Sequence, residues 1–312
     1  MSQPTTIKKT VLLTGGGRGL AVAAAEKIAA VDNLEVIVTV RSKSQVESVQ
    51  AGFKQKGFSV RVLPLAFDDF ASVAAFPNEL RSNGIESLDV VVLSAAVMQT
   101  SPERRVTKNG FEETLQVNVL SQLMLVELLT EFLQRGNNPR IVTLTSRLHF
   151  PDSRGLPVDF SFDDPNLESP GAYNPDRAYK NSKLAVLWMT YALQDYFKQK
   201  QFPIKVNAFC PGFVPQTAAH STKSWWTWFL LKFVIPHMSF ATSIDSAAEV
   251  YKFMALDDSF NDVDGAGFYT EKVAAKSSDE SYDKEKQTRF LEWAVTQYEK
   301  FLPSGQSQLK LI

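Results

Sequence analysis

The chain has few of the residues that build metal sites and disulfides. It contains one cysteine, Cys210, so no disulfide can form within it, and a free thiol fits a reducing compartment. No basic neighbour in the sequence activates this thiol, so we interpret Cys210 as structural. The three histidines, His149, His220 and His237, are scattered without the spacing of metal ligands, so we expect no metal site.

An excess of one charge is also missing. The 33 lysines and arginines nearly balance the 34 aspartates and glutamates, which leaves a net charge of -1. Proteins that bind nucleic acids carry basic surfaces, so we expect no nucleic-acid partner. With 44% hydrophobic residues, the composition is that of an ordinary soluble globular protein, and 312 residues fit one large α/β domain.

Long apolar runs are absent as well. The first ten residues are polar and lack the apolar core of a signal peptide. The most apolar stretch, residues 224–240 (SWWTWFLLKFVIPHMSF), is shorter than the roughly 20 residues that span a bilayer. We therefore expect a cytoplasmic protein without a transmembrane segment.

The N-terminal region reads as a strand, a glycine loop and a helix. Residues 10–14 (TVLLT) are apolar and β-branched, and they lead through GGGRGLA into an alanine-rich stretch that ends near residue 30. Glycines let the backbone approach a phosphate, and a helix N-terminus presents free N–H groups to it. The contacts that we expect in this loop are Gly15, Gly17, Arg18, Gly19 and Leu20. The alternative is a glycine-rich turn that holds no ligand.

The residue after the second predicted strand, 35–41 (EVIVTVR), bears on the choice of dinucleotide. A carboxylate there would bind the adenosine ribose, whereas an arginine would pair with a 2′-phosphate. This chain has Arg41, and Arg18 could reach the same phosphate. Two arginines without a carboxylate favour NADPH over NADH, although either one could be a solvated surface charge.

Tyr179 and Lys183 lie four residues apart in a segment that predicts a helix. Asn174 suits the N-cap, Pro175 suits the first helical position, and an apolar run follows from residue 184 to 197. The spacing places the phenol and the ammonium on one helical face. An ammonium beside a phenol would lower the phenol's pKa from about 10 towards the operating range, which predicts an acid/base pair. The same spacing occurs by chance on many helices.

Together these motifs resemble those of short-chain dehydrogenases/reductases. Residues 14–21 match the fingerprint Thr-Gly-x-x-x-Gly-x-Gly except that Ala21 replaces the last glycine, and the Tyr-x-x-x-Lys pair is present. The strand predicted over 140–146 ends in Ser146, where the family carries its catalytic serine. Strands alternate with helices from residue 10 to 270, so we predict a single domain with a Rossmann-type, doubly wound parallel sheet.

The resemblance implies a catalytic tetrad of Asn118, Ser146, Tyr179 and Lys183. In the family, the asparagine kinks a long helix, here predicted over 109–135, and holds a water that links the lysine to solvent. The alternative for Asn118 is a buried side chain that bonds a backbone carbonyl.

The resemblance also implies a row of cofactor contacts at the strand ends. Ala66 stands where the family usually has an adenine-binding aspartate, so we expect the backbone of Phe67 or a neighbouring aspartate to substitute. Ser94 replaces the usual asparagine of Asn-Ala-Gly. The full set of expected NADP(H) contacts is Gly15, Gly17, Arg18, Gly19, Leu20, Arg41, Phe67, Ser94, Ala95, Tyr179, Lys183, Pro211, Gly212 and Val214.

Three segments distinguish this chain from the simpler family members. An active-site insert covers residues 147–175, a substrate lid is expected over 216–240, and a C-terminal helix over 276–304. The insert resembles that of retinol dehydrogenase-like and protochlorophyllide reductase-like proteins, and since in some of these it covers a dimerisation face, we expect a monomer. The apolar stretch within 216–240 could instead be plain core or make peripheral membrane contact through Trp225–Phe233.

The predicted function is NADPH-dependent reduction of a bulky lipophilic ketone or aldehyde, or the reverse oxidation of an alcohol, for example in a biosynthetic pathway. The expected partner is a small lipophilic substrate molecule, and a lid rich in tryptophan would select one that is bulky, flat or lipophilic. One alternative is C=C reduction like that of protochlorophyllide reductases, which carry a similar Ala-Tyr-Lys-Asn-Ser-Lys hexad. A second alternative is a scaffold or sensor that binds NADPH without turnover.

Overall fold

A computed structural model describes residues 8–215, 241–260 and 265–309, and its strands form one sheet of eight. The strand order is β3-β2-β1-β4-β5-β6-β7-β8, and all neighbours are parallel except β7 and β8. The strands are β1 (Lys9–Leu13), β2 (Leu34–Val40), β3 (Val60–Pro64), β4 (Val90–Leu93), β5 (Arg140–Leu144), β6 (Lys205–Cys210), β7 (Phe268–Thr270) and β8 (Val273–Ala275). The predicted doubly wound α/β fold is confirmed.

The chain reverses direction across the sheet between β1 and β4. It builds β1, β2 and β3 outward and then returns to the other side of β1 for β4, β5 and β6. Connections that diverge from two adjacent strands leave a crevice beyond their C-terminal ends, where ligands of open α/β sheets bind. The central strands are apolar and buried on both faces, as every residue of β4 shows.

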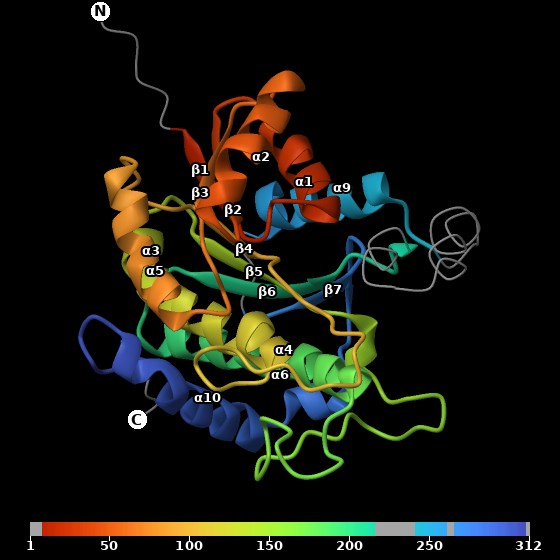
Figure 1. The fold of residues 1–312 in the computed structure, drawn as a ribbon. Coiled ribbons are helices and arrows are strands. Elements are labelled where there is room, and N and C mark those ends of the chain that lie inside the picture. The colour runs from red at the N-terminus through yellow and green to blue at the C-terminus, as the bar shows by residue number, and fades with distance from the viewer. Residues whose placement is uncertain (1–7, 216–240, 261–264, 310–312) are drawn as a thin grey trace, which may run out of the picture.

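Helices cover both faces of the sheet (Figure 1). On one face lie α1 (Gly19–Ala29), α2 (Lys43–Gln55) and α9 (Ile244–Leu256), which share a hydrophobic core with the sheet. On the other face lie α3 (Phe70–Ser82), α5 (Ser121–Gln134), α6 (Pro175–Gln199) and α10 (Lys284–Tyr298), around a second core. Trp188 of α6 is among the largest fully buried side chains of that core.

The helix expected over 109–135 is interrupted. It begins as the short α4 (Glu113–Leu115), widens into a π-helical turn at Gln116–Leu120, and continues as α5. A π-turn inserts an extra residue into the helical ladder and is often found at functional sites. Asn118 lies in this turn, so the interruption expected at Asn118 takes the form of a π-helical turn.

The insert at 147–175 is largely loop, with a short 3-10 turn at Arg147–His149. Its aromatic residues pack on the outer side of α6 and α10. The Phe162 ring stacks on Trp188 with 5.6 Å between ring centroids, and the Phe160 ring meets Trp188 edge-on at 5.1 Å. The insert therefore covers part of α6. That the protein is a monomer stays a prediction. The predicted lid at 216–240, including Trp225–Phe233, lies outside the described residues.

Candidate active site

Ser146 lies just beyond the C-terminal end of β5, at the mouth of the crevice. Its extended backbone makes it the N-cap of the following 3-10 turn, and its hydroxyl accepts a hydrogen bond from the Leu148 N–H at 3.3 Å. The Ser146 hydroxyl lies near the Tyr179 phenol, where it favours ionisation of the phenol and so opposes part of the rise in its pKa. The two hydroxyls that the sequence paired are thus adjacent in the structure.

The local sequence of α6 places Tyr179 and Lys183 as predicted. The Asn174 side chain caps the helix by accepting from the N–H groups of Asp176 and Arg177 at 2.9 and 3.2 Å, and Pro175 occupies the first turn. Because the two residues are one turn apart, the Lys183 Nζ lies over the Tyr179 ring, 5.3 Å from its centroid.

Lys183 is a buried ammonium, with only 1% of the residue exposed. Its Nζ donates to the carbonyl of Leu144 at the end of β5, at 3.0 Å. Burial lowers the pKa of Lys183 to about 8, because the charged form loses its hydration. The lysine is therefore fixed at the strand end beside Ser146.

The expected direction of the Tyr179 pKa shift is wrong. Burial raises the pKa of Tyr179 to about 12, and the nearby Ser146 hydroxyl compensates only in part. The ammonium of Lys183 bonds the Leu144 carbonyl and lies over the ring face, so desolvation of the phenolate dominates. The phenol is consequently held in its protonated form near neutral pH.

Asn118 joins the π-turn to the site through its amide. Its Oδ1 accepts from the Val97 N–H at 2.8 Å, while its Nδ2 donates to the Val97 carbonyl and to the Ser182 hydroxyl, both at 3.0 Å. The residue is completely buried. The alternative considered for Asn118, a buried amide bonded to backbone, describes these contacts. Through the Ser182 hydroxyl, Asn118 contacts the residue that precedes Lys183 in the chain.

Replacing Asn118 by leucine is expected to lower the free energy of unfolding by about 2 kcal/mol, because the Val97 backbone groups and the Ser182 hydroxyl lose their partner. Denaturant titration measures this change. Asn181→Leu is the matched control, since the buried Asn181 amide has no hydrogen-bond partner among the described residues. Equal losses in the two variants would contradict this role for Asn118.

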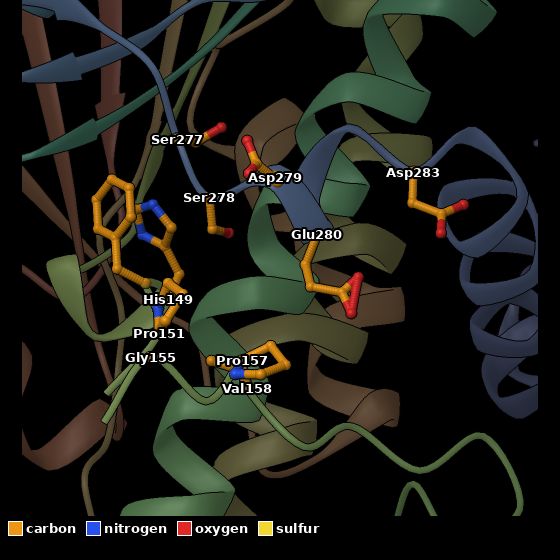
Figure 2. Close-up of a pocket in the computed structure, with 11 residues that line it drawn as sticks. His149, Pro151, Gly155, Pro157, Val158, Ser277, Ser278, Asp279, Glu280 and Asp283 are labelled. Carbon is orange, nitrogen blue, oxygen red and sulfur yellow. The ribbon is translucent and has the colours of Figure 1, made fainter. Parts of the chain in front are cut away.

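His149 was considered in the sequence only as a metal ligand, and its actual contact was missed. Its Nδ1 lies 2.5 Å from the carbonyl oxygen of Ser146, and the ring is 1% exposed. Burial lowers the pKa of His149 to about 4, so the imidazole is neutral near neutral pH. The residue also lines a cavity under the insert (Figure 2). The spacing of three residues from Ser146 is the only signal of this contact that the sequence carries.

The glycine loop is fixed against the neighbouring strands. The N–H groups of Gly15 and Gly16 donate to the hydroxyl and carbonyl of Thr39, at 3.1 and 2.8 Å. A Cβ at Gly16 would lie 2.4 Å from the Cβ of Val38, so no other residue fits there without moving β2. Gly17 is half-buried and Gly19, with φ of 61°, opens α1. The loop thus needs glycine for its close approach to β2.

The N-terminus of α1 fits an anionic group. Arg18 is its exposed N-cap, and in the described part of the chain no side chain caps the helix and no acidic residue lies in its first turn. Its first N–H groups are thus available to a phosphate. The Leu20 side chain instead packs on the core of this face.

Ser94 and Ala95 follow β4 at the point where the chain reverses across the sheet. Their N–H groups donate to the Thr14 hydroxyl at 2.9 and 3.0 Å, which ties the end of β4 to the end of β1. The Ser94 hydroxyl bonds that of Tyr251 on α9, at 2.9 Å. Both residues therefore border the crevice next to the glycine loop.

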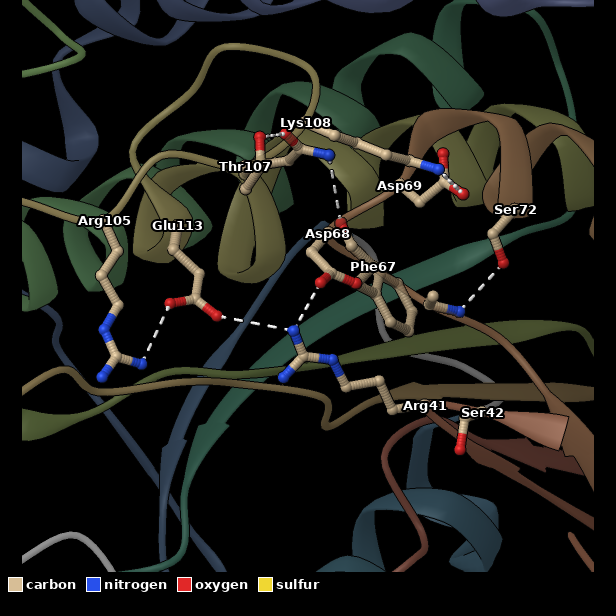
Figure 3. A network of polar contacts seen from close by, with 12 residues as sticks. Arg41, Ser42, Phe67, Asp68, Asp69, Ser72, Arg105, Thr107, Lys108 and Glu113 are labelled. Atoms are coloured by element: carbon tan, nitrogen blue, oxygen red, sulfur yellow. Dashed lines mark hydrogen bonds and ion pairs between the residues drawn. The ribbon is translucent and has the colours of Figure 1, made fainter. Parts of the chain in front are cut away.

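Arg41 is engaged by carboxylates (Figure 3). Its Nη2 lies 2.5 Å from an oxygen of Asp68 and 3.8 Å from one of Glu113, and the side chain remains 63% exposed. The prediction that Arg41 pairs with a 2′-phosphate did not include this ion pair with Asp68. A 2′-phosphate would compete with Asp68 for Arg41.

The carbonyl of Phe67, whose backbone was expected to contact the adenine, is occupied by hydrogen bonds within the protein. The carbonyl of Phe67 accepts from the Ser121 hydroxyl at 2.5 Å and from the Gln116 side chain at 3.4 Å, so it already serves the fold. Asp69 caps α3 by accepting from the Ala71 N–H at 3.0 Å. Of the neighbouring aspartates, Asp68 remains beside Arg41.

The loop after β6 closes the other side of the crevice. Gly212 has φ of +88°, and a Cβ there would lie 2.0 Å from the Thr242 hydroxyl oxygen, so glycine is required. Pro211 and Val214 are buried. Cys210 is also buried, and burial raises the pKa of its thiol, consistent with a structural cysteine.

The described ranges hold neither a cluster of metal ligands nor a helix that could cross a membrane. In residues 8–215, 241–260 and 265–309, His, Cys, Asp and Glu side chains do not gather in groups of three or more that could hold a metal ion. Over the same ranges, no helix has the length and apolar character to cross a membrane.

Comparisons with known proteins agree with this geometry. Residues 9–157 match the family model of short chain dehydrogenases. Human polyprenol dehydrogenase is 28% identical over 275 residues, which cover 86% of this chain and 79% of the human protein. Protochlorophyllide reductase of Chlamydomonas reinhardtii is 26% identical over 230 residues, which cover 68% of this chain and 57% of that protein.

The fold has a close counterpart among solved structures. An uncharacterised protein of Mycobacterium paratuberculosis superposes with a TM-score of 0.72 at 23% sequence identity, and the match covers 95% of both chains. This likeness concerns the fold alone.

Proposed function

Because this chain belongs to the short-chain dehydrogenase/reductase family, we propose that it is an NADPH-dependent enzyme that reduces a bulky lipophilic ketone or aldehyde, or catalyses the reverse reaction. The observation that carries the proposal is that the Ser146 and Tyr179 hydroxyls are neighbours, with the buried Lys183 ammonium over the phenol ring. Such a cluster beyond the carboxyl ends of a parallel sheet has the composition of a proton-transfer site.

The crevice residues fit a dinucleotide, and a reduced nicotinamide supplies hydride when it is bound. The glycine loop and the uncapped start of α1 would hold the pyrophosphate. Ser94 and Ala95 would border the ribose, and the backbone from Pro211 to Val214 would flank the nicotinamide side. Lys183 would hold the nicotinamide ribose with its ammonium.

The two hydroxyls would share one oxygen of the substrate. Ser146 donates a hydrogen bond to the carbonyl oxygen, and Tyr179 transfers its proton to that oxygen as negative charge develops there. The phenol, whose pKa burial raises to about 12, is protonated near neutral pH and therefore ready to donate. This supports reduction as the favoured direction, because oxidation would start from the phenolate.

A lipophilic substrate is supported by the kinds of relative found. The human relative is a polyprenol dehydrogenase, so its name gives a polyprenol as the substrate of that protein. The proposal for this chain is the broader class, an apolar carbonyl compound or alcohol.

A cytoplasmic, monomeric enzyme remains our expectation.

Reduction of an activated C=C bond is the second candidate. It is favoured by the similarity to protochlorophyllide reductase and by the shared hexad Ala178–Lys183. The same phenol would then protonate carbon instead of oxygen.

A panel of lipophilic ketones, aldehydes and enones, monitored through NADPH absorbance with NADH as control, tests the proposal. We expect NADPH to be consumed with at least one apolar carbonyl compound. Tight NADPH binding without consumption across the panel would refute turnover and support the scaffold alternative.

Arg41 is expected to set the cofactor preference. Arg41→Ala should raise the KM for NADPH about tenfold or more and change that for NADH less than twofold, since a charge-assisted bond contributes about 1.5–3 kcal/mol. Asp68→Asn should lower the KM for NADPH, because it removes the competitor for Arg41. Lys108→Ala is the control, since Lys108 pairs with Asp69 instead. Equal effects of Arg41→Ala on the two cofactors would contradict the NADPH assignment.

A further inference from the structure

Helix α9 and the residues just before it contact three segments that border the crevice. The helix lies beside α1, the helix that follows the glycine loop (Figure 1), and its Asp245 pairs with Lys27 of α1 at 2.8 Å. The N–H of Thr242, just before α9, donates to the carbonyl of Phe213 in the loop after β6, at 2.7 Å. The third contact is made by Tyr251 and reaches the end of β4. This part of the chain therefore supports the crevice from both sides.

The contact of Tyr251 is a single hydrogen bond between two hydroxyls. Its phenolic oxygen lies 2.9 Å from the hydroxyl oxygen of Ser94, and the two residues are 1% and 8% exposed. Within the described part of the chain, neither hydroxyl has another hydrogen-bond partner. The Tyr251 ring is itself fixed, because it packs edge-on against Phe209 of β6 with 4.7 Å between ring centroids. The side chain of Ser94 is therefore oriented by Tyr251.

The backbone at the end of β4 is held by other residues. The N–H groups of Ser94 and Ala95 donate to the Thr14 hydroxyl, and the Gln122 side chain donates to the Ala95 carbonyl at 2.5 Å. Tyr251 adds the one bond that acts on a side chain at this strand end. Ligands of open α/β sheets bind beyond such ends, at the point where the chain reverses across the sheet.

Tyr251 also lies close to the proposed proton-transfer site. Burial raises the pKa of Tyr251, and the neighbouring phenol of Tyr179 and thiol of Cys210 raise it further. The Tyr251 phenol is therefore protonated near neutral pH. A protonated phenol can donate or accept in its bond to Ser94, so this bond is kept across the physiological pH range.

We propose that Tyr251 is a positioning residue for the nicotinamide half of the cofactor: through its bond to Ser94 it fixes the strand end that would border the nicotinamide ribose. The inference rests on the proposed function, which supplies the ribose. Tyr251 contacts Ser94 and would not itself touch the cofactor. Its loss should therefore weaken binding of the nicotinamide half and spare the adenosine half.

Nucleotide binding, measured by calorimetry, tests this inference without any turnover. Tyr251→Phe removes one hydroxyl and keeps the ring against Phe209. It should raise the Kd for NADPH about fivefold, as is typical for the loss of one neutral hydrogen bond. Its Kd for adenosine 2′,5′-bisphosphate, which lacks the nicotinamide and its ribose, should stay unchanged.

Tyr196→Phe is the matched control. It removes the hydroxyl of another buried tyrosine, which donates to the Gln308 carbonyl at 2.8 Å, and should change neither Kd. A bond that only stabilised the fold would lower the melting temperature of Tyr251→Phe and leave its Kd for NADPH at the wild-type value. That result would overturn the inference, as would an equal loss of affinity for the bisphosphate.

A double-mutant cycle shows whether Tyr251 acts through Ser94. Ser94→Ala should also weaken NADPH binding selectively, and Tyr251→Phe should have no further effect in the Ser94→Ala background. Additive losses would overturn the inference and leave the proposed function standing, whereas a wild type that binds neither nucleotide would refute both. Circular dichroism verifies folding. Should Tyr251→Phe misfold, Ser94→Ala keeps the test decisive, because unchanged NADPH binding in that variant would also overturn the inference.

Discussion

Replacing Tyr179 by phenylalanine is expected to lower kcat about a thousandfold while NADPH binds as in the wild type. The substitution removes the hydroxyl that, in the proposed reaction, transfers a proton to the substrate oxygen, and general acid catalysis typically contributes about 10²–10⁴-fold. The aromatic ring stays, so its contact with the Lys183 ammonium and the packing of α6 are retained. Steady-state kinetics and fluorescence titration with NADPH measure the two quantities separately.

Tyr173→Phe is the control for this substitution. The Tyr173 hydroxyl is buried without a hydrogen-bond partner among the described residues, so its removal should change kcat less than twofold. A Tyr179→Phe enzyme with turnover within tenfold of the wild type would contradict the assignment of Tyr179 as the proton donor.

Replacing Lys183 by methionine should lower kcat/KM about a thousandfold without lowering thermal stability. The activity falls because, in the proposed reaction, the ammonium holds the nicotinamide ribose and stabilises negative charge on the Tyr179 phenol. Stability is kept because the wild type buries a charge: a pKa lowered from 10.5 to about 8 corresponds to about 3 kcal/mol at 1.36 kcal/mol per pKa unit. Loss of the bond to the Leu144 carbonyl offsets about 1–3 kcal/mol of this relief.

The same substitution has a defined pH dependence. Between pH 8 and 10.5 the unfolded chain keeps the proton of Lys183 that the folded chain has released, so stability rises with pH across this window. The wild type should therefore gain stability relative to Lys183→Met from pH 8 towards 10.5, as measured by urea unfolding. Lys180→Met, which removes a half-buried lysine paired with Asp176, is the control. It should neither lower kcat/KM nor change how stability depends on pH. A fall of several degrees in the melting temperature of Lys183→Met would contradict this account.

Features encoded by local sequence could be predicted. The Asn174 cap and the strands predicted over 10–14, 35–41 and 140–146 depend on neighbouring residues, and the structure has them within two residues of the expected bounds. Ser146 and Tyr179 meet because a strand end and a helix of fixed topology bring them together.

Features that depend on distant contacts could not be predicted. β8, which pairs antiparallel with β7, has three residues, and three residues are too few for a periodic signal. Arg41 pairs with Asp68 only because β2 and the loop after β3 end side by side. The pKa of Tyr179 depends on how deeply the hydroxyl is buried, which residue spacing does not reveal.

Transfer of deuterium from 4-deuterated NADPH to a lipophilic enone, located in the product by mass spectrometry and NMR, tests the central claim most directly. A carbonyl reductase built on Tyr179 and Ser146 should place the label on the carbon that becomes the carbinol carbon, and the Tyr179→Phe variant should abolish this product. A label on the β-carbon of a saturated ketone would identify a C=C reductase instead. No transferred label from any apolar enone or ketone, in a protein that binds NADPH, would contradict the account.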